Sequence, residues 1–356
     1  MKRILLLPGD GIGPEVTWPA LELLQTALRL HGRPVPEVET ALIGGEAIDA
    51  TGDPLPPATV ERARASSAVF LGAVGGPRWD LGPRRPEEGL LGLRKALGVF
   101  ANLRPIRLAP DLGDMSPLRP ERLGRCDFLI VRELTGGLYF GARGRTAEGA
   151  FDTLTYTRAE VARVAHVAFR YARERGLGRV QLVDKANVLE SSRLWREVVR
   201  EVALEYPEVA LEVELVDSCA FRMVKDPGHY TVILTENLFG DILSDLGAGI
   251  VGSLGLLPSA SLGEGGPGLF EPVHGSAPDI AGTGQANPMG AMGAMAMLAR
   301  WGLGEPQVAD AMEAAVDRVV ARGVRTRDLS APGEGLDTGA FTAAVVAALE
   351  RSGIHA

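Results

Sequence analysis

The chain has 356 residues, and its 37 Lys and Arg against 45 Asp and Glu give a net charge of −8 at neutral pH. This acidic balance argues against a general nucleic-acid or anionic-membrane binder, since either would need a basic surface. The apolar content of 46% excludes a disordered chain, and two cysteines are too few for a disulfide framework or a four-cysteine zinc site. No apolar run reaches the roughly 18 residues of a membrane span. We therefore expect a cytoplasmic protein of about two domains, or of one large α/β unit.

Short apolar runs alternate with longer amphipathic segments along the chain. Residues 4–7 are predicted to form the first strand, and a helix is predicted from Pro14 to about residue 30, because a proline followed by an acid suits a first turn. Further strands are predicted at 68–71, 128–131, 180–183, 211–216 and 231–234, and further helices at 158–175, 190–206 and around 289–297. This alternation predicts an α/β fold with a largely parallel sheet. Residues 136–157 mix aromatic and β-branched residues with glycines, which predicts an extended arm or hairpin.

Two glycine-rich segments are candidate ligand loops. Gly9, Gly11 and Gly13 follow the first strand, but their spacing is one residue short of the Rossmann pattern and no acid follows a second strand at the expected distance. Residues 263–288 contain seven glycines and one histidine. Glycines there would let the backbone approach a ligand closely, and an irregular surface loop is the alternative.

Asp241 and Asp245 are four residues apart in a predicted helix that begins just after a strand. Side chains at this spacing share one helix face, where two like charges destabilise each other unless a cation joins them. Oxygen ligands suit Mg²⁺ or Mn²⁺, and Asp217, at the end of the preceding strand, could supply a third oxygen. Two solvated acids and a turn aspartate are the alternative, and the spacing does not decide between the two interpretations.

Three arginines lie in settings typical of a ligand site. Arg94, Arg104 and Arg132 lie in or near apolar runs, and Arg132 directly follows a strand, where a guanidinium fork can reach a ligand carboxylate. A structural ion pair is the alternative for each. Lys185 also follows a strand and is one of only four lysines; arginine cannot accept a proton at neutral pH, so a base here must be lysine. A surface lysine is the alternative, and Tyr139 is either an acid or a packed aromatic.

Ordered segments along nearly the whole chain carry a resemblance to a known family. They are LLPGDGIGPE (6–15), GAVGGPRWD (72–80), LLGLRKALGVFANLRP (90–105), VRELTGGLYFG (131–141), VDKANVLESSRLWR (183–196), TENLFGDILSD (235–245), GSLGLLPSASLG (252–263) and EPVHGSAPDIAG (271–282). Together they resemble the β-decarboxylating dehydrogenases, a family that includes isopropylmalate, isocitrate, homoisocitrate and tartrate dehydrogenases.

The resemblance implies an α/β fold that is not a Rossmann fold, with two domains that share a central sheet. We expect a first domain from residues 1–99 and 252–356, with the NAD-binding loops. We expect a second from residues 100–251, with the dimer interface and the metal and base residues. The resemblance also implies a homodimer in which an arm at about 136–157 pairs between subunits. The family's active site lies in the interdomain cleft, where the lysine and one metal aspartate come from the partner chain.

The resemblance assigns roles to residues of this sequence. Arg94, Arg104 and Arg132 would hold the substrate carboxylates, with Lys185 as base and Tyr139 as acid. Asp217, Asp241 and Asp245 would bind Mg²⁺ or Mn²⁺, and Asp217 would also contact substrate. The positions that match contacts to the alkyl group are Glu87, Leu90, Leu91 and Val188. The positions expected to bind NAD are Ile12, Glu271, His274, Gly275, Ser276, Ala277, Asp279 and Asn287.

The alkyl-contact positions favour a branched alkyl substrate. The expected reaction is oxidative decarboxylation of 3-isopropylmalate to 4-methyl-2-oxopentanoate and CO₂ with reduction of NAD, in leucine biosynthesis. Tricarboxylates should react poorly, because burying an unpaired charge costs more than accommodating a methylene. Asp279 would accept hydrogen bonds from ribose hydroxyls and repel a 2′-phosphate, which favours NAD over NADP. The alternatives are a relative acting on D-malate, tartrate or homoisocitrate, and a non-catalytic regulatory subunit, which the intact lysine, tyrosine and aspartates disfavour.

Overall fold

The computed structural model describes residues 2–353, and the chain divides into two compact units. Unit 1 comprises Met1–Val99, Ala109–Met115 and Ser253–Ala356, so it contains both the early and the late parts of the chain. Unit 2 comprises Phe100–Leu108 and Ser116–Gly252. Among the described residues, no helix is both long enough and apolar enough to cross a membrane.

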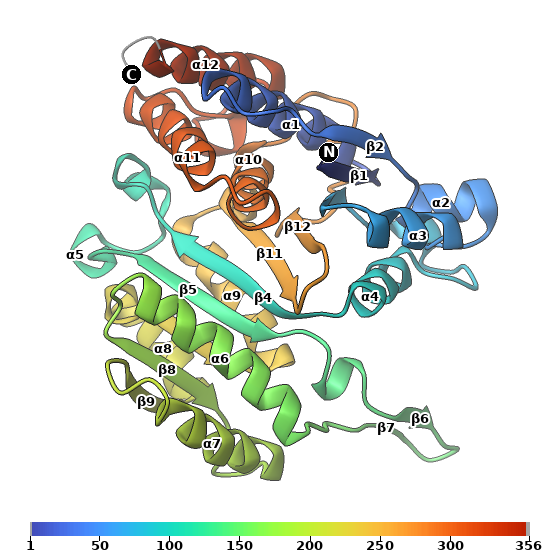
Figure 1. The fold of residues 1–356 in the computed structure, drawn as a ribbon, viewed down its shortest axis with the longest axis vertical. Coiled ribbons are helices and arrows are strands. Elements are labelled where there is room, and N and C mark those ends of the chain that lie inside the picture. Colours follow the sequence, from blue (N-terminus) through green and yellow to red (C-terminus); the bar gives the residue numbers. More distant parts are fainter. Residues whose placement is uncertain (1, 354–356) are drawn as a thin grey trace. The chain divides into compact units, whose positions relative to one another are not determined.

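Unit 1 alternates strands and helices and then ends in a run of helices (Figure 1). Its strands are β1 (Arg3–Gly9), β2 (Glu37–Thr40), β3 (Ala68–Ala73), β11 (Pro258–Gly263) and β12 (Gly268–Pro272). Its helices are α1 (Gly13–Leu30), α2 (Gly44–Thr51), α3 (Pro57–Ala65), α4 (Pro86–Leu97), α10 (Met289–Met297), α11 (Pro306–Ala321) and α12 (Thr338–Gly353). Short 3₁₀ helices lie at Pro77–Trp79, Pro110–Met115, Leu254–Leu256 and Arg327–Leu329, and a π-helical turn lies at Leu298–Gly302.

The strands of unit 1 are hydrogen-bonded in the order β2-β1-β3-β12-β11. β1 runs parallel to β2 and β3, β12 runs parallel to β3, and β11 is antiparallel to β12. Ile4, Leu5, Leu6 and Leu7 have no exposed surface, as expected for a strand covered on both faces. Helices α1, α10, α11 and α12 pack against one another beside these strands (Figure 1).

Unit 2 is a second α/β unit with a small separate hairpin. Its strands are β4 (Val99–Arg107), β5 (Asp127–Glu133), β6 (Arg143–Arg145), β7 (Ala150–Asp152), β8 (Arg179–Asp184), β9 (Ala210–Leu215) and β10 (Val232–Thr235). Its helices are α5 (Pro120–Leu123), α6 (Arg158–Glu174), α7 (Glu190–Ala203), α8 (Val216–Lys225) and α9 (Asn237–Val251), with 3₁₀ turns at Gly137–Tyr139 and Pro227–His229. Its main strands follow the order β4-β5-β10-β8-β9, in which only β4 and β5 pair antiparallel.

The structure confirms the α/β class and most of the predicted elements. The sheet is largely parallel, as predicted, apart from β4 and β11, neither of which was predicted and each of which pairs antiparallel with a neighbour. One prediction needs correction. The segment 263–288 is not a continuous loop, because Gly268–Pro272 forms the buried strand β12. Five residues give too short an apolar run to reveal a strand by periodicity alone.

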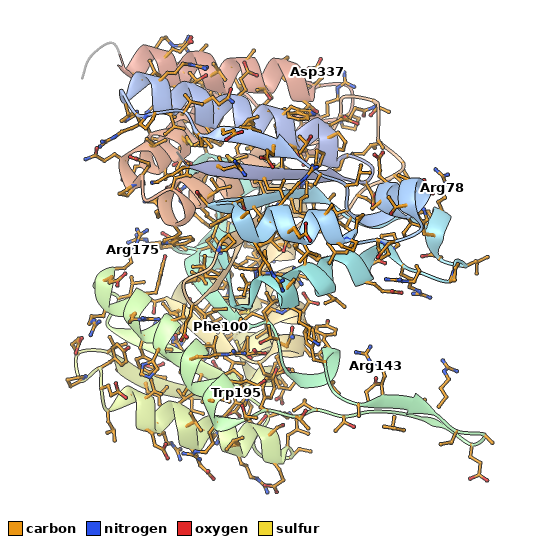
Figure 2. The ribbon with its side chains drawn as sticks, turned by 45° about the vertical axis from the view of Figure 1, so that its right-hand side comes forward. Arg78, Phe100, Arg143, Arg175, Trp195 and Asp337 are labelled. Carbon is orange, nitrogen blue, oxygen red and sulfur yellow. The ribbon has the colours of Figure 1, made fainter. Side chains whose placement is uncertain are left out.

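The predicted arm contains a two-stranded hairpin that extends from the body of unit 2 (Figure 1). Strands β6 and β7 pair antiparallel from Arg143 with Asp152 to Arg145 with Ala150. Figure 2 shows Arg143 on this hairpin, and Trp195, on α7, within the body of unit 2. Trp195 is buried and meets the ring of Tyr156 edge-on at 5.3 Å. The chain that leaves the hairpin is therefore held in the core of unit 2 by this aromatic pair.

Candidate active site

Two buried arginines and a tyrosine of unit 2 converge on Asp241 of α9. Arg132, near the end of β5, donates from Nε and Nη2 to Asn237 Oδ1 at 2.9 and 2.7 Å, and its Nη1 contacts Asp241 Oδ1. Arg104 of β4 places Nη1 3.3 Å from the same oxygen. The Tyr139 hydroxyl donates to Asp241 Oδ2 at 2.7 Å. Antiparallel pairing of β4 with β5 and parallel pairing of β5 with β10 bring these residues together.

Burial raises the pKa values of two groups in this cluster. Burial, followed by the hydrogen bond to Asp241, raises the pKa of Tyr139 to about 12, so the phenol keeps its proton at neutral pH. Burial also raises the pKa of Asp245, although the charge of Arg104 opposes this effect. Asp245 Oδ1 lies 3.9 Å from Arg104 Nη1. The site therefore combines cationic groups for anionic ligands with a phenol that can donate a proton.

Asp241 and Asp245 lie one turn apart on α9 with their side chains 35% and 64% exposed. Two accessible carboxylates are oxygen donors of the kind that Mg²⁺ and Mn²⁺ prefer, so the residues present fit such an ion in part. Among the described residues of the single chain, no group of three His, Cys, Asp or Glu could hold a metal. The third predicted ligand, Asp217, lies on a different helix and has another partner.

Lys185 and Asp217 form a pair of their own in unit 2. Lys185 Nζ donates to Asp217 Oδ1 at 2.6 Å, and this hydrogen bond lowers the pKa of Asp217. Asp217 does not end a strand as expected, because β9 stops at Leu215 and the residue lies in the first turn of α8. Beside it is a pocket of about 520 Å³ that Glu214, Asp217, Ser218, Phe221, Arg222, Lys225 and Asp226 line.

Several supporting residues were not found from the sequence. Asn237 orients Arg132 and also donates from Nδ2 to the Gly136 carbonyl at 3.1 Å, and Ser244 Oγ accepts from Arg104 at 2.6 Å. Asp184, next to Lys185, is held by Arg196 through two hydrogen bonds of 2.6 and 2.9 Å. Their position beside predicted site residues was the available signal, since Asn237 and Ser244 have their partners in distant segments and local sequence does not show that Arg196 reaches back to Asp184.

In unit 1, Arg94 of α4 and Glu271 of β12 form a buried ion pair. Arg94 Nη2 lies 2.6 Å from Glu271 Oε1, and both side chains are 9% exposed. Arg94 Nε is buried and has no hydrogen-bond partner among the described residues. A buried donor without a partner is costly, so this atom is suited to a ligand carboxylate. On the same helix, Leu90 and Leu91 are partly exposed and Glu87 is exposed.

Of the predicted NAD-binding residues, Glu271 lies in β12, those from His274 to Asn287 lie on the irregular segment after it, and Ile12 lies in a turn that contacts this segment. Ile12 N donates to the Ser276 carbonyl at 2.8 Å. His274 Nδ1 lies 2.9 Å from the Gly275 carbonyl, so Nδ1 carries the hydrogen and Nε2 presents a lone pair. That Nε2 is buried without a partner among the described residues, and burial lowers the pKa of His274. A neutral acceptor of this kind fits a ligand hydroxyl or amino group.

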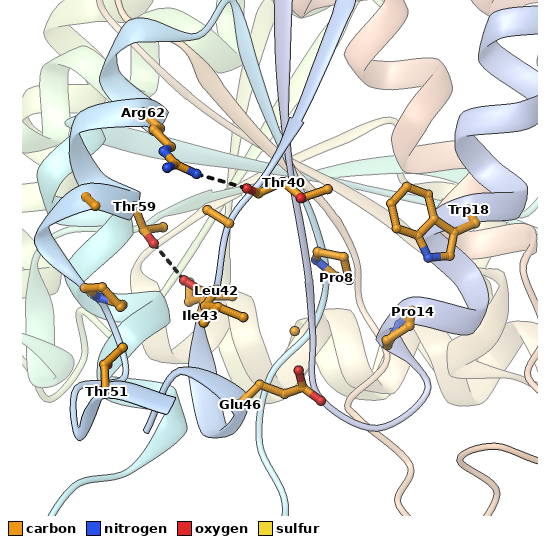
Figure 3. Close-up of a pocket in the computed structure, with 14 residues that line it drawn as sticks. Pro8, Pro14, Trp18, Thr40, Leu42, Ile43, Glu46, Thr51, Thr59 and Arg62 are labelled. Carbon is orange, nitrogen blue, oxygen red and sulfur yellow. Dashed lines mark hydrogen bonds between the residues drawn. The ribbon is translucent and has the colours of Figure 1, made fainter. Parts of the chain in front are cut away.

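Two further observations concern sites outside these clusters. Val188, the remaining alkyl-contact candidate, is 63% exposed in the turn after Lys185. Unit 1 also has a pocket of about 530 Å³, which Figure 3 shows between Trp18 of α1 and Thr59 of α3. None of the predicted site residues lines this pocket.

The fold and these clusters agree with one family. The chain belongs to the isocitrate/isopropylmalate dehydrogenase family, whose model matches residues 3–345.

Among curated proteins, the chain is 55% identical to the 3-isopropylmalate dehydrogenase of Shouchella clausii, over 98% of this chain and 97% of that protein. It is 52% identical to the 3-isopropylmalate dehydrogenase of Bacillus subtilis, with the same coverage.

Two solved structures share the fold. The isocitrate dehydrogenase of Methylococcus capsulatus superposes with a TM-score of 0.88 at 36% identity, covering 98% of this chain and 99% of that one. A β-decarboxylating dehydrogenase of Thermococcus kodakarensis in its apo form superposes with a TM-score of 0.78 at 39% identity, covering 99% of this chain and 97% of that one. The family resemblance and the α/β fold inferred from the sequence motifs are therefore confirmed.

Proposed function

We propose that this chain oxidises and decarboxylates 3-isopropylmalate to 4-methyl-2-oxopentanoate and CO₂ with reduction of NAD, as a cytoplasmic enzyme of leucine biosynthesis. The observation that carries the proposal is the convergence of Arg104, Arg132 and Tyr139 on Asp241. This arrangement combines guanidinium groups for a dicarboxylate, a protonated phenol and a carboxylate suited to a divalent cation. The names of the curated relatives support the substrate.

The residues of the chain divide between binding the substrate and moving protons. Arg104 and Arg132 bind substrate carboxylates, and Arg94 adds its buried Nε, which has no partner among the described residues. Leu90 and Leu91 of α4, with Val188, contact the alkyl group, and Glu87 disfavours an extra carboxylate in its place. Because the arginines and the two leucines are held on strands and helices, they orient the C2–H bond of the substrate before reaction.

Asp241 and Asp245, together with Asp217, would hold Mg²⁺ or Mn²⁺, and the loop with His274 and Asp279 would bind NAD. When bound, the cation would supply Lewis-acid stabilisation of charge on the substrate oxygen, and NAD would supply the acceptor for the hydride of C2. Lys185 Nζ takes the proton of the C2 hydroxyl during this oxidation. After the bond between C3 and the departing carboxylate breaks, the Tyr139 hydroxyl gives its proton to C3.

We further propose that the site is completed by a second copy of the chain, which supplies Lys185 and Asp217. Two features support a homodimer. Lys185 and Asp217 pair with each other, apart from the cluster around Asp241. The β6–β7 hairpin is exposed along Ala150–Asp152, with Phe151 52% exposed, and an isolated two-stranded sheet is only marginally stable in water.

The test of the reaction is NADH formation by the purified chain with NAD and Mg²⁺. We expect kcat/KM for 3-isopropylmalate to exceed that for D-malate, tartrate, isocitrate and homoisocitrate by at least about a hundredfold, since the other substrates lack the alkyl group or add a charge. Excess EDTA should abolish the activity, and added Mg²⁺ or Mn²⁺ should restore it. Equal or better use of isocitrate or D-malate would refute the substrate, and full activity in EDTA would refute the metal requirement.

Shared active sites can be tested separately by mixing two inactive variants, Lys185→Ala and Asp241→Asn. A mixed dimer contains one site with both an intact lysine and an intact aspartate only if these residues come from different chains. Subunit exchange should therefore restore activity that neither variant has alone. A mixture that stays inactive although mixed dimers are detected by mass would contradict the sharing.

A further inference from the structure

We infer that Glu15, which has no part in the proposed chemistry, is a positioning residue that holds the dinucleotide-binding loop in the shape that binds NAD. The inference rests on the proposed function, because it takes residues 273–288 to be the NAD-binding loop. It means that a residue in the first turn of α1 contributes to the affinity for NAD.

The loop has a conformation that its own sequence does not favour. Between β12 and α10 it contains neither helix nor strand. Ala277 has a φ of 39°, and within residues 2–353 it is the only residue other than glycine with a positive φ. Such a conformation is costly and persists only where surrounding structure imposes it. Contacts from outside the loop must therefore hold it.

The first contact lies at the N-terminal side of the loop. Ile12 N donates to the Ser276 carbonyl at 2.8 Å. A Cβ built on Gly11 would lie 2.1 Å from the same carbonyl oxygen, so only glycine allows the turn 9–13 to approach this closely. This contact holds the backbone directly before the strained Ala277.

Glu15 provides the second contact, at the C-terminal side. Its two carboxylate oxygens accept the backbone N–H groups of Gly282 and Gly284, the latter at 3.0 Å. Both glycines have a left-handed backbone conformation, with φ of 76° and 66°. Neighbouring residues in such conformations can point their backbone N–H groups towards the same anion. Hydrogen bonds to a charged acceptor are among the stronger ones in proteins. One side chain on a long helix thus fixes two points of the loop.

A third residue holds the other side of the same segment. Thr338 N donates to the Gly284 carbonyl at 2.9 Å, and Thr338 Oγ1 donates to the Ala286 carbonyl at 2.6 Å. Gly284 is therefore held from both sides, by Glu15 at its N–H and by Thr338 at its carbonyl. Glu15 is the only charged group in this set of contacts.

Asp279 lies between the two anchored ends and is exposed. No side-chain hydrogen bond or ion pair of Asp279 exists among the described residues, so its place depends on the backbone that carries it. A loop that is already ordered does not lose conformational entropy when NAD binds, and its affinity is correspondingly higher. Removing the Glu15 carboxylate should loosen the loop and weaken NAD binding, with the substrate-binding arginines unaffected.

A competing explanation is that Glu15 only favours the helix dipole as an acid in the first turn of α1. That role would change helix stability but would not move the loop. The two explanations differ in hydrogen exchange at Gly282 and Gly284 and in NADH affinity, which the dipole role leaves unchanged.

The test compares Glu15→Gln with Glu22→Gln, a matched change at an exposed position of the same helix. Glutamine keeps the size of the side chain but cannot accept both N–H groups through two oxygens. We expect Glu15→Gln to accelerate hydrogen exchange at the Gly282 and Gly284 amides. It should raise the Kd for NADH and the KM for NAD about tenfold or more, the loss of one charged hydrogen bond. At saturating NAD, kcat and the KM for 3-isopropylmalate should stay within about twofold of wild type. Glu22→Gln should change none of these.

The inference would be overturned if Glu15→Gln had the same exchange rates at Gly282 and Gly284, and the same Kd for NADH, as Glu22→Gln. A change in thermal stability alone would not rescue it. Glu15→Asp serves as the conservative variant and should recover part of the lost affinity. Failure of the proposed function has a different signature: wild-type chain that binds NADH but does not oxidise 3-isopropylmalate. In that case faster exchange and weaker NADH binding in Glu15→Gln would still support the positioning role.

Discussion

Replacing Gly240 by alanine tests the packing that holds Arg132 at the candidate site. Gly240 lies in the first turn of α9, and a Cβ built there would lie 2.7 Å from Arg132 Cβ and 2.6 Å from its Cγ. Carbon atoms in contact are normally about 3.5–4.0 Å apart. The new methyl group therefore overlaps Arg132 by about 1 Å, and the clash involves the base of the side chain, which cannot swing away as its tip could.

The expected effect is larger on activity than on stability. Alanine is favoured over glycine in a helix interior by about 1 kcal/mol, and overpacking costs about 1–3 kcal/mol, so the net loss of stability should be about 0–2 kcal/mol. Arg132 donates two hydrogen bonds to Asn237 Oδ1, and a displaced guanidinium cannot keep this geometry. Losing one charged hydrogen bond to substrate is worth about 1.5–3 kcal/mol, which corresponds to a fall in kcat/KM of roughly 10–100-fold.

The assay is steady-state kinetics with 3-isopropylmalate alongside urea unfolding. The matched control is Gly249→Ala on the same helix, at an exposed position where a new Cβ meets no atom within 4 Å apart from its chain neighbours and the backbone of its own helix. We expect the control to keep wild-type activity and to gain about 0.5–1 kcal/mol of stability. Wild-type kcat/KM in Gly240→Ala would refute the argument that close packing on Gly240 sets the position of Arg132.

Three further predictions test separate parts of the chain. Lys185→Arg keeps a cation beside Asp217 but cannot take a proton at neutral pH, so kcat should fall about a hundredfold or more; near-normal turnover would remove the base role. Asp279→Lys should raise the ratio of kcat/KM for NADP to that for NAD, because it replaces a repelling carboxylate with a cation, and an unchanged ratio would contradict the cofactor argument. Burial raises the pKa of Cys126 to about 11 and that of Cys219 to about 12, so a thiol reagent should label neither in the native protein at mildly alkaline pH. Both should react on unfolding, and rapid native labelling would contradict the burial.

The residues that make contacts at the site separate what the sequence could predict from what it could not. Arg104, Arg132, Tyr139 and Asp241 were all predicted as site residues, because their flanking motifs are characteristic of the family. Asn237, which orients Arg132, was missed, since nothing in its local sequence shows that Arg132, 105 positions earlier, is its partner. From the sequence, Glu15 was interpreted only as an acid in the first turn of a helix. Its carboxylate oxygens in fact accept hydrogen bonds from the backbone amides of Gly282 and Gly284, more than 260 residues later.

The sequence by itself determined the α/β class, the family and the types of reactive residue, because local periodicity and motif order depend only on neighbours along the chain. Only the tertiary structure decided that Gly268–Pro272 is a strand and that the sheet is mixed. It also decided that Asp217 begins a helix and pairs with Lys185. The physical reason is that strand pairing, burial and hydrogen bonds between distant segments depend on which surfaces meet in the folded chain. The small number of lysines drew attention to Lys185 in the sequence, but only the structure shows that its partner is Asp217.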